Sequence, residues 1–318
     1  MSEPQGTSRT RTPLRDAARV LRQWPPIVAE TMGWRDPEPM VPAAGPLPHP
    51  DFWKRTDLGA TWLGQATTII RLGPLTILTD PVLEERIGIR IGGRTFGRRR
   101  STALPDDLHH LPTPDLVLLT HAHMDHWDRR TLRRLAHPRT TVIVPPRTAR
   151  LLPRGFGHVH ELAWHQAVTL EGVHIEAMRP NHWGARFVFD RRRGYNAYIL
   201  RHDTATMLFA GDTAHTDAFD HLDDIDVAVL GIGNSYEPWD RYHATPEQAA
   251  AMATAMNARL LMPIHHSTFR DPVEPLDEPL ERLRRVWDAE RLICARIGET
   301  WGLTSRSLTT GRTTTGQG

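Results

Sequence analysis

Cysteine, lysine and long apolar runs are nearly absent from this chain of 318 residues, and each absence excludes a class of protein. Cys294 is the single cysteine, so no intramolecular disulfide can form and nothing indicates an oxidising compartment. No apolar run approaches the roughly 20 residues that span a bilayer. Residues 1–12 lack the apolar segment of a secretory signal. We therefore expect a soluble, cytoplasmic protein.

Lys54 is the only lysine among the 39 basic residues, and the formal net charge is only +2. With neither a lysine-rich patch nor an appended basic segment, we expect no nucleic-acid partner. One arginine cluster is nevertheless dense. It lies in a glycine-rich stretch after Asp80-Pro81 and comprises Arg86, Arg90, Arg94, Arg98, Arg99 and Arg100. Two interpretations stay open: a flexible cationic loop that closes over an anionic substrate, or solvated surface.

The chain divides into three predicted parts. Residues 1–50 form an N-terminal extension, residues 51–303 a catalytic domain, and residues 304–318 a disordered tail rich in Thr, Gly and Ser. Within the extension, apolar residues recur at helical spacing from Leu14 to Trp24, and Pro25-Pro26 should end that helix. Arginines occupy its other side. Such a helix either docks on its own domain or makes peripheral contact with an anionic membrane, and composition does not decide between them.

The most informative motif is Thr120-His121-Ala122-His123-Met124-Asp125-His126. It directly follows the apolar run 116–119, which predicts a buried strand whose end projects these side chains into one crevice. His and Asp are ligands that suit Zn²⁺ or a related transition metal. The four ligands in this loop are too many for a single catalytic zinc with an open position, so the loop predicts two metal ions.

Further candidate ligands follow three other predicted strands. His182 comes after residues 173–178, Asp212 after residues 206–209, and His265 after residues 259–264. Because each stands at the end of a strand, all can converge on one edge of a sheet. Short strands are also expected at 61–63, 66–72 and 75–79. A helix opened by Thr245-Pro246-Glu247-Gln248 has a threonine cap, an early proline and a glutamine that reaches back.

The ordered pattern H-x-H-x-D-H, then a lone His, a G-D-T aspartate and a late His, resembles the metallo-β-lactamase fold superfamily. Flanking motifs resemble its branch of N-acyl-phosphatidylethanolamine phospholipase D and ascorbate-6-phosphate lactonases. They are Trp62-Leu63-Gly64, Leu78-Thr79-Asp80-Pro81, Asn181-His182-Trp183, Phe209-Ala210-Gly211-Asp212-Thr213, Tyr236-Glu237-Pro238 and Ile264-His265. The resemblance covers about residues 59–285 and implies an α/β fold, a four-layer αββα sandwich.

The resemblance also implies the roles of individual residues. One metal would be held by His121, His123 and His182. The second would be held by Asp125, His126 and His265, with Asp212 as the bridge. Both metals would be divalent transition ions of zinc type, and a metal-bound hydroxide would be the nucleophile, oriented by Asp125. His243 would contact substrate as a phosphate ligand or general acid, and Met124, Trp183 and Tyr236 would lie beside the substrate.

Two departures from the family pattern stand out. Gln65 replaces the usual histidine after Trp62-Leu63-Gly64, and an amide cannot titrate. The late motif reads His265-His266-Ser267-Thr268-Phe269 instead of His-Trp-Gly-Thr-Phe; we take His265 as the ligand and expect His266 to face elsewhere.

The sequence therefore predicts a hydrolase with two metals that acts on a small-molecule or lipid substrate carrying an anionic group. A phosphodiesterase of phospholipase D type is the first interpretation. A lactonase for a phosphorylated sugar acid is the second, and a metal-binding scaffold without turnover is an alternative of another class. The oligomeric state stays open.

Overall fold

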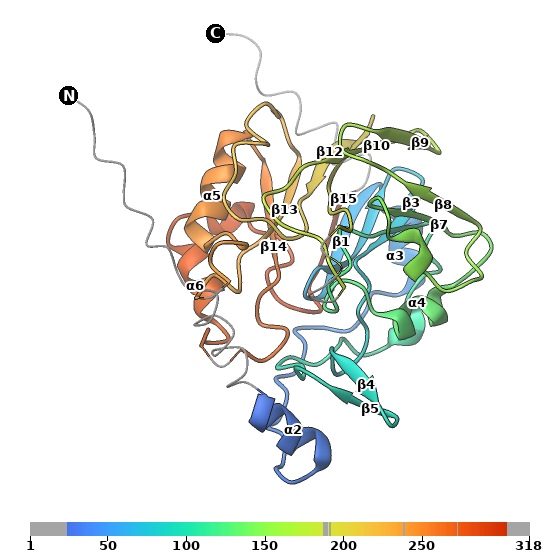
Figure 1. Ribbon diagram of the computed structural model, residues 1–318. Coiled ribbons are helices and arrows are strands. Elements are labelled where there is room, and N and C mark those ends of the chain that lie inside the picture. The colour runs from blue at the N-terminus through green and yellow to red at the C-terminus, as the bar shows by residue number, and fades with distance from the viewer. Residues whose placement is uncertain (1–23, 187–189, 191, 238, 272, 304–318) are drawn as a thin grey trace.

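The computed structural model of this protein describes residues 24–186, 190, 192–237, 239–271 and 273–303. The predicted tail 304–318 and the predicted helix up to residue 23 lie outside the described residues. Two large β-sheets pack face to face, with helices on both outer faces (Figure 1). The predicted αββα sandwich is thus confirmed.

The first sheet has seven strands in the order β15-β1-β2-β3-β6-β7-β8. Their bounds are Thr300–Leu303 (β15), Leu58–Gly64 (β1), Thr67–Leu72 (β2), Leu75–Thr79 (β3), Leu116–Leu118 (β6), Thr141–Val144 (β7) and His158–Glu161 (β8). The turn Gly73-Pro74 joins β2 and β3, and Gly73 adopts a left-handed φ of 53° that favours glycine there. β3, β6 and β7 run parallel, so their carboxyl ends meet at one edge.

The second sheet has six strands in the order β14-β13-β12-β11-β10-β9. Their bounds are Leu260–Ile264 (β14), Val227–Gly231 (β13), Ala205–Phe209 (β12), Ala197–His202 (β11), Val173–Met178 (β10) and Ala167–Leu170 (β9). β12, β13 and β14 are parallel, and their apolar residues are nearly all buried, as expected of strands covered on both faces.

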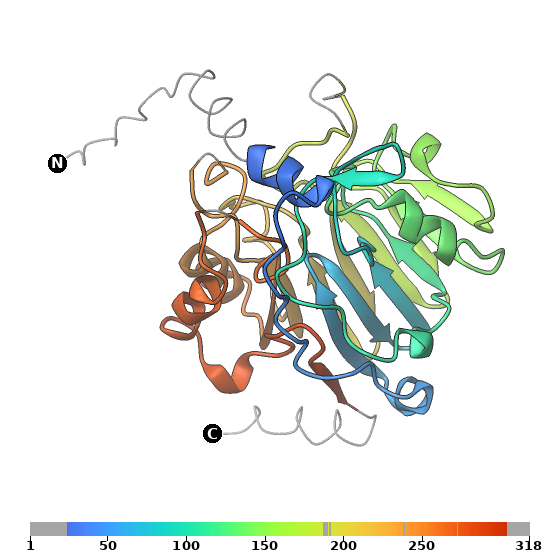
Figure 2. The same cartoon turned by 90° about the horizontal axis from the view of Figure 1, so that it is seen from below.

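The largest apolar cluster lies between the sheets and joins residues such as Ile77 and Leu118 of the first to Phe209 and Val229 of the second. The helices α5 (Pro246–Ala255) and α6 (Glu278–Arg284) cover the outer face of the second sheet. On the opposite side α3 (Pro50–Arg55) and α4 (Arg129–Leu135) cover the first sheet (Figures 1 and 2). The described residues also contain three 3₁₀ turns of three residues each, Leu108–His110, Ala149–Leu151 and Ala289–Arg291.

Local sequence signals explain the start of α5 well. The Thr245 side chain accepts from the Gln248 backbone N–H, and the Gln248 side chain accepts from the Thr245 backbone N–H at 3.0 Å. This is the capping box that the sequence predicted, with Pro246 in the first turn. The following helix is short, because α6 ends at Arg284 and Ala289–Arg291 forms a separate 3₁₀ turn.

The described part of the N-terminal extension contacts the domain that follows it. α2 spans Trp24–Met32 and contains Pro25 and Pro26 near its first residue. Proline lacks only its N–H and is tolerated where that group has no acceptor, as in a first helical turn. Leu47 is buried in the cluster under α3, and the Ala44 backbone N–H donates to the Ile297 carbonyl.

The arginine-rich stretch is folded, which the sequence did not predict. It forms an antiparallel hairpin of β4 (Ile89–Ile91) and β5 (Arg94–Phe96), beside α2 at one end of the molecule (Figures 1 and 2). Gly92 and Gly93 make its turn, both with positive φ. Among the described residues, no helix is both long and apolar enough to cross a membrane.

Candidate metal centre

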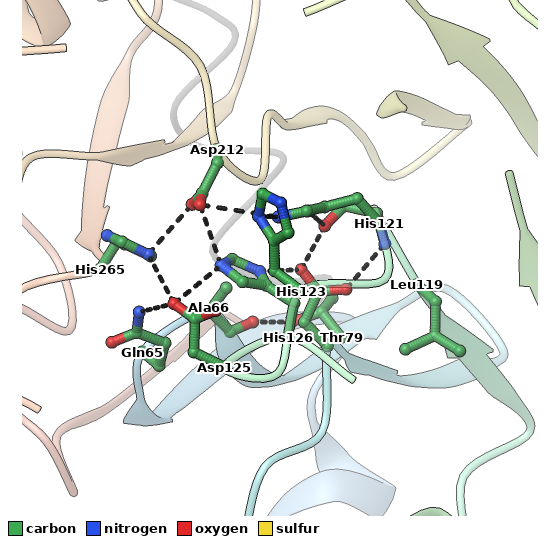
Figure 3. A network of polar contacts seen from close by, with 12 residues as sticks. Gln65, Ala66, Thr79, Leu119, His121, His123, Asp125, His126, Asp212 and His265 are labelled. Atoms are coloured by element: carbon green, nitrogen blue, oxygen red, sulfur yellow. Dashed lines mark hydrogen bonds and ion pairs between the residues drawn. The ribbon is translucent and has the colours of Figure 1, made fainter. Parts of the chain in front are cut away.

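The predicted ligands come from loops that follow β6, β10, β12 and β14, and the structure brings them together. The loop after β6 supplies His121, His123, Asp125 and His126. His182, Asp212 and His265 follow the other three strands. Figure 3 shows most of these side chains pointing at one another from both sheets.

The described residues gather three groups of potential ligand atoms, of which the smallest joins Asp80, His121 and His126, and the two larger groups share one residue. His121, His123, His182 and Asp212 form the first group, and Asp125, His126, His265 and the same Asp212 form the second; within each group the ligand atoms lie within 4.8 Å of one another. Asp212 Oδ2 is 3.7 Å from His182 Nε2 and 3.1 Å from His126 Nε2. Asp212 Oδ1 is 3.2 Å from His265 Nε2. Asp212 is therefore the residue that these two groups have in common.

Divalent ions fit this donor set. Among the described residues, Asp212 Oδ1, His126 Nε2 and His265 Nε2 are buried without a hydrogen-bond partner. Such atoms cost free energy unless something satisfies them. An ion in each group would do so, with the nitrogen and oxygen ligands that zinc prefers.

The protonation states of the side chains in the site also suit metal binding. Burial lowers the pKa of His121, and it lowers the pKa of His123 to about 3, so both imidazoles are neutral at physiological pH. Burial alone would raise the pKa of Asp212, but His126 and His265 outweigh it and hold that pKa well below its usual range. Neutral imidazoles and an ionised carboxylate are the forms that bind metal. Burial also opposes a charge on His126, but Asp212 and Asp125 raise its pKa, so an ion would displace a proton there.

A second layer of contacts orients the ligands. The Asp80 carboxylate accepts from Thr120 and lies 2.7 Å from His126 Nδ1, which leaves Nε2 facing Asp212. Asp80 thus orients His126, whereas Asp128, the other aspartate close to this loop in sequence, accepts from Arg130 and Thr131 as the cap of α4.

His265 and His266 point in different directions although they are neighbours. His265 has a left-handed φ of 62°, which turns the backbone between the two side chains. His265 Nε2 is 3.4 Å from Asp125 Oδ2, in the second ligand group. His266 instead packs on Trp62, with ring centroids 4.5 Å apart, and its Nδ1 is 2.8 Å from Ser267 Oγ.

A cleft of about 430 Å³ opens on the ligands from one side; we call it the apolar cleft. Met124, Trp183 and His243, which the sequence predicts to lie beside the substrate, line this cleft. Sequence reasoning missed most of its wall, which comes from four remote segments: Ile27, Ile87, Ile89, Phe96, Trp239 and Tyr242. Isolated apolar residues in loops and in a three-residue strand give no sequence signal of a shared cavity.

Tyr236 is placed differently from the prediction. It does not line the apolar cleft, and its hydroxyl donates to Glu278 at 2.5 Å. Trp239 and Tyr242, a few residues on, provide the aromatic side chains of the cleft instead.

A second cavity, of about 540 Å³, reaches the same centre; we call it the polar chamber. Gln65, Asp125 and His265 line it at the ligand side. It is more polar than the apolar cleft, because charged and hydroxylated side chains such as Glu30, Ser267 and Arg270 alternate in its wall with apolar ones such as Val41 and Phe269. The two cavities share Ile87, Arg98, Asp125 and Asn234, so the ligands lie between an apolar and a polar space.

Of the two interpretations of the arginine cluster, neither fits Arg86, Arg99 and Arg100, which are held by partners within the fold. Arg100 is 1% exposed, and its guanidinium donates to the carbonyls of Val82 at 2.7 Å and Leu63 at 3.2 Å. Arg86 pairs with Glu30 at 3.2 Å, and Arg99 pairs with Glu85. Buried carbonyls and carboxylates fix these side chains, which composition could not reveal. Of the six arginines, only Arg98 lines the apolar cleft.

Arg186 is a further residue that the sequence did not single out. Its guanidinium donates to the carbonyls of Ala122 at 3.3 Å and Trp127 at 2.5 Å, the two sides of the ligand loop. Burial lowers its pKa to about 10, so it stays charged at neutral pH. It also lines the apolar cleft.

Comparisons with known proteins agree with this geometry. A family model described as beta-lactamase superfamily domain matches residues 76–266. The N-acyl-phosphatidylethanolamine-hydrolyzing phospholipase D 1 of Caenorhabditis elegans is 26% identical over 284 residues, which cover 80% of this chain and 79% of that protein. The mitochondrial enzyme of that name from Saccharomyces cerevisiae is 27% identical over 260 residues, covering 76% of this chain and 55% of that protein.

Among solved structures, the isothiocyanate hydrolase from Delia radicum gut bacteria superposes with a TM-score of 0.62 at 19% identity. The alignment covers 78% of this chain and all of that one (100%). At this identity the likeness concerns the fold.

Proposed function

This chain belongs to the beta-lactamase superfamily, and on that premise we propose that it is a dinuclear metal-dependent phosphodiesterase that cleaves amphiphilic substrates. That it is a metal-dependent hydrolase follows from the family; two metals, zinc and the diester are our proposal. The observation that carries the proposal is Asp212, which takes part in both ligand groups and lines the apolar cleft.

The residues that would hold the ions are those of the two groups. Two bound divalent ions would lower the pKa of a water toward about 7 and neutralise charge on attacking and leaving oxygens. The relatives named for phospholipase D activity supply the reaction type. Water oxygen bonds to phosphorus, the bond from phosphorus to one ester oxygen breaks, and that arm leaves as an alcohol that takes up a proton.

The protein's own residues would orient this reaction. Asp125 borders both cavities, so its carboxylate can accept a hydrogen from the attacking water. Burial lowers the pKa of His243 well below its usual range, so this imidazole is neutral and acts as a hydrogen-bond donor to a phosphoryl oxygen more readily than as an acid. Its Nδ1 is 3.8 Å from Asp212 Oδ2. Arg98 offers a guanidinium to the anionic group.

The contrast between the cavities supports a substrate with two unlike arms. The apolar cleft suits an alkyl or acyl arm, and the polar chamber suits a hydroxylated or charged arm. Because a buried CH₂ is worth about 0.8 kcal/mol, a hexyl 4-nitrophenyl phosphodiester should exceed its methyl analogue in kcat/KM by more than about tenfold.

A matched pair of variants tests where the alkyl arm binds. Ile89 lines the apolar cleft, whereas Ile91 of the same strand is 64% exposed and does not. Ile89→Asn should reduce the preference for hexyl, and Ile91→Asn should keep it. If both variants keep it, the alkyl arm binds elsewhere.

The reaction type is tested with zinc-loaded protein on diester, lactone and β-lactam reporters. Diester cleavage that His123→Ala abolishes would support the proposal. Turnover of the lactone alone would favour a lactonase for phosphorylated sugar acids, and no turnover of any reporter would favour a metal-binding scaffold.

A further inference from the structure

Gln65 occupies the position where the family pattern has histidine, and its side chain faces a predicted ligand. Gln65 Nε2 donates to Asp125 Oδ2 at 2.7 Å (Figure 3). The same oxygen is 3.4 Å from His265 Nε2 and 3.7 Å from His126 Nε2. The amide therefore reaches the carboxylate oxygen that faces the other ligands of the second group.

The backbone of Gln65 is fixed independently of its side chain. Residue 65 lies in the turn between β1 and β2, with a left-handed φ of 50°. Its N–H donates to Thr268 Oγ1 at 2.5 Å, and its carbonyl accepts from the His265 backbone N–H at 2.9 Å and from Trp62 Nε1 at 3.0 Å. Gln65 is 5% exposed. The turn is thus clamped to the loop of His265.

We propose that Gln65 is a positioning residue for the second metal site. It holds the Asp125 carboxylate in a fixed place relative to His265. One residue links the two loops: its backbone binds the His265 loop and its side chain binds Asp125. A carboxylate oxygen has room for an amide donor besides a metal ion. Because an amide does not titrate, this donor is present at every pH. The inference rests on the two-metal site of the proposed function.

Substitutions of the Gln65 side chain distinguish a role in positioning Asp125 from a general contribution to the stability of the fold. Gln65→Met keeps the length and the backbone bonds but removes the donor. Loss of an outer contact to a metal ligand typically costs about 10- to 100-fold in metal affinity. The loss should fall on the second ion alone, because His121, His123 and His182 do not contact Gln65. Gln65→His, which restores a ring N–H donor, should recover much of the affinity. Gln166→Met is the matched control, since the side chain of this exposed glutamine accepts from the Ala163 N–H, away from the ligands.

The experiment is a Zn²⁺ titration of the apoprotein against a chelating dye, which resolves two stepwise dissociation constants. We expect Gln65→Met to raise the dissociation constant of the ion in the second site by about 10- to 100-fold. The dissociation constant of the other ion should not change. Two unchanged constants would overturn the proposal. Equal weakening of both, with a lower Tm of the apoprotein, would also overturn it and assign a structural role. If wild type binds a single ion, the two-metal proposal itself fails, which is a separate outcome.

Discussion

At the scale of single residues, His266 shows how burial controls protonation. It is 3% exposed, and burial, with smaller contributions from His265 and Arg284, lowers its pKa from 6.5 to about 3. Below pH 6.5 the unfolded chain binds a proton at this histidine that the folded chain does not. The free energy of unfolding therefore falls as the pH drops from about 6.5 toward about 3, by about 1.4 kcal/mol per pH unit, and is insensitive above that window.

In the His266→Asn variant, the free energy of unfolding should depend less on pH below about 6.5 than in wild type. Asparagine can keep the contact with Ser267 but binds no proton. Urea unfolding with chelator at pH 7 and pH 5 should show a drop in unfolding free energy that is smaller than in wild type by up to about 2 kcal/mol. An equal drop in both proteins would mean that His266 is protonated in the folded state.

Arg98 is the member of the arginine cluster that the structure places beside the ligands. Its Nη2 lies 3.1 Å from Asp271 Oδ2, and its exposed neighbour in the hairpin, Arg94, lies outside both cavities. If Arg98 binds the anionic group, Arg98→Gln should raise KM for a phosphodiester about tenfold, since hydrogen bonds to charged groups contribute about 1.5–3 kcal/mol.

The salt dependence and a neutral substrate provide the controls for Arg98. The variant should flatten the salt dependence of kcat/KM and leave a neutral lactone or ester reporter unaffected. Arg94→Gln should behave as wild type. A loss of similar size on neutral and anionic reporters would show that Arg98 supports the fold of the hairpin instead.

At the scale of elements, the loop after β12 requires glycine at position 211. Gly211 has a left-handed φ of 58°, and a Cβ there would lie 2.6 Å from Thr120 Cγ2. Thr120 in turn donates to Asp80, which orients His126. A methyl group at 211 would therefore disturb both ligand loops.

The Gly211→Ala variant should lose about 1–3 kcal/mol of stability from backbone strain and also most of its metal affinity. Thermal unfolding with and without Zn²⁺ measures both effects. Gly92→Ala is the control: φ is 55° there too, but nothing lies within 4 Å of the added carbon. If both variants lose the same stability and keep full metal affinity, the contact with Thr120 has no effect on the site.

Local signals predicted the elements where sequence dictates structure directly. The capping box of α5 and the strand 173–178 are where periodicity and turn chemistry place them. The hairpin of β4 and β5 was missed because three-residue strands with exposed side chains carry no burial pattern. The roles of Arg100 and Arg186 were missed for another reason: their partners are backbone carbonyls of segments remote in sequence.

At the scale of the molecule, two sheets that face each other bring loops from four strands to one edge. The order of ligands along the chain was enough to predict which residues meet, because each follows an apolar strand. The wall of the cleft was not predictable, since it is assembled from α2, the β4–β5 hairpin and the loop of Trp239. The sequence thus indicates the candidate metal centre, whereas tertiary packing determines the shape of the cleft beside it.

The central claim is that Asp212 bridges two metal ions, and metal stoichiometry tests it most directly. Protein purified without chelator and equilibrated with Zn²⁺ should contain about two ions per chain by elemental analysis. Asp212→Ala should fall to about one or fewer, because the variant removes a ligand from both groups. Wild-type protein that binds at most one ion at saturation, or an Asp212→Ala variant that still binds two, would contradict the account.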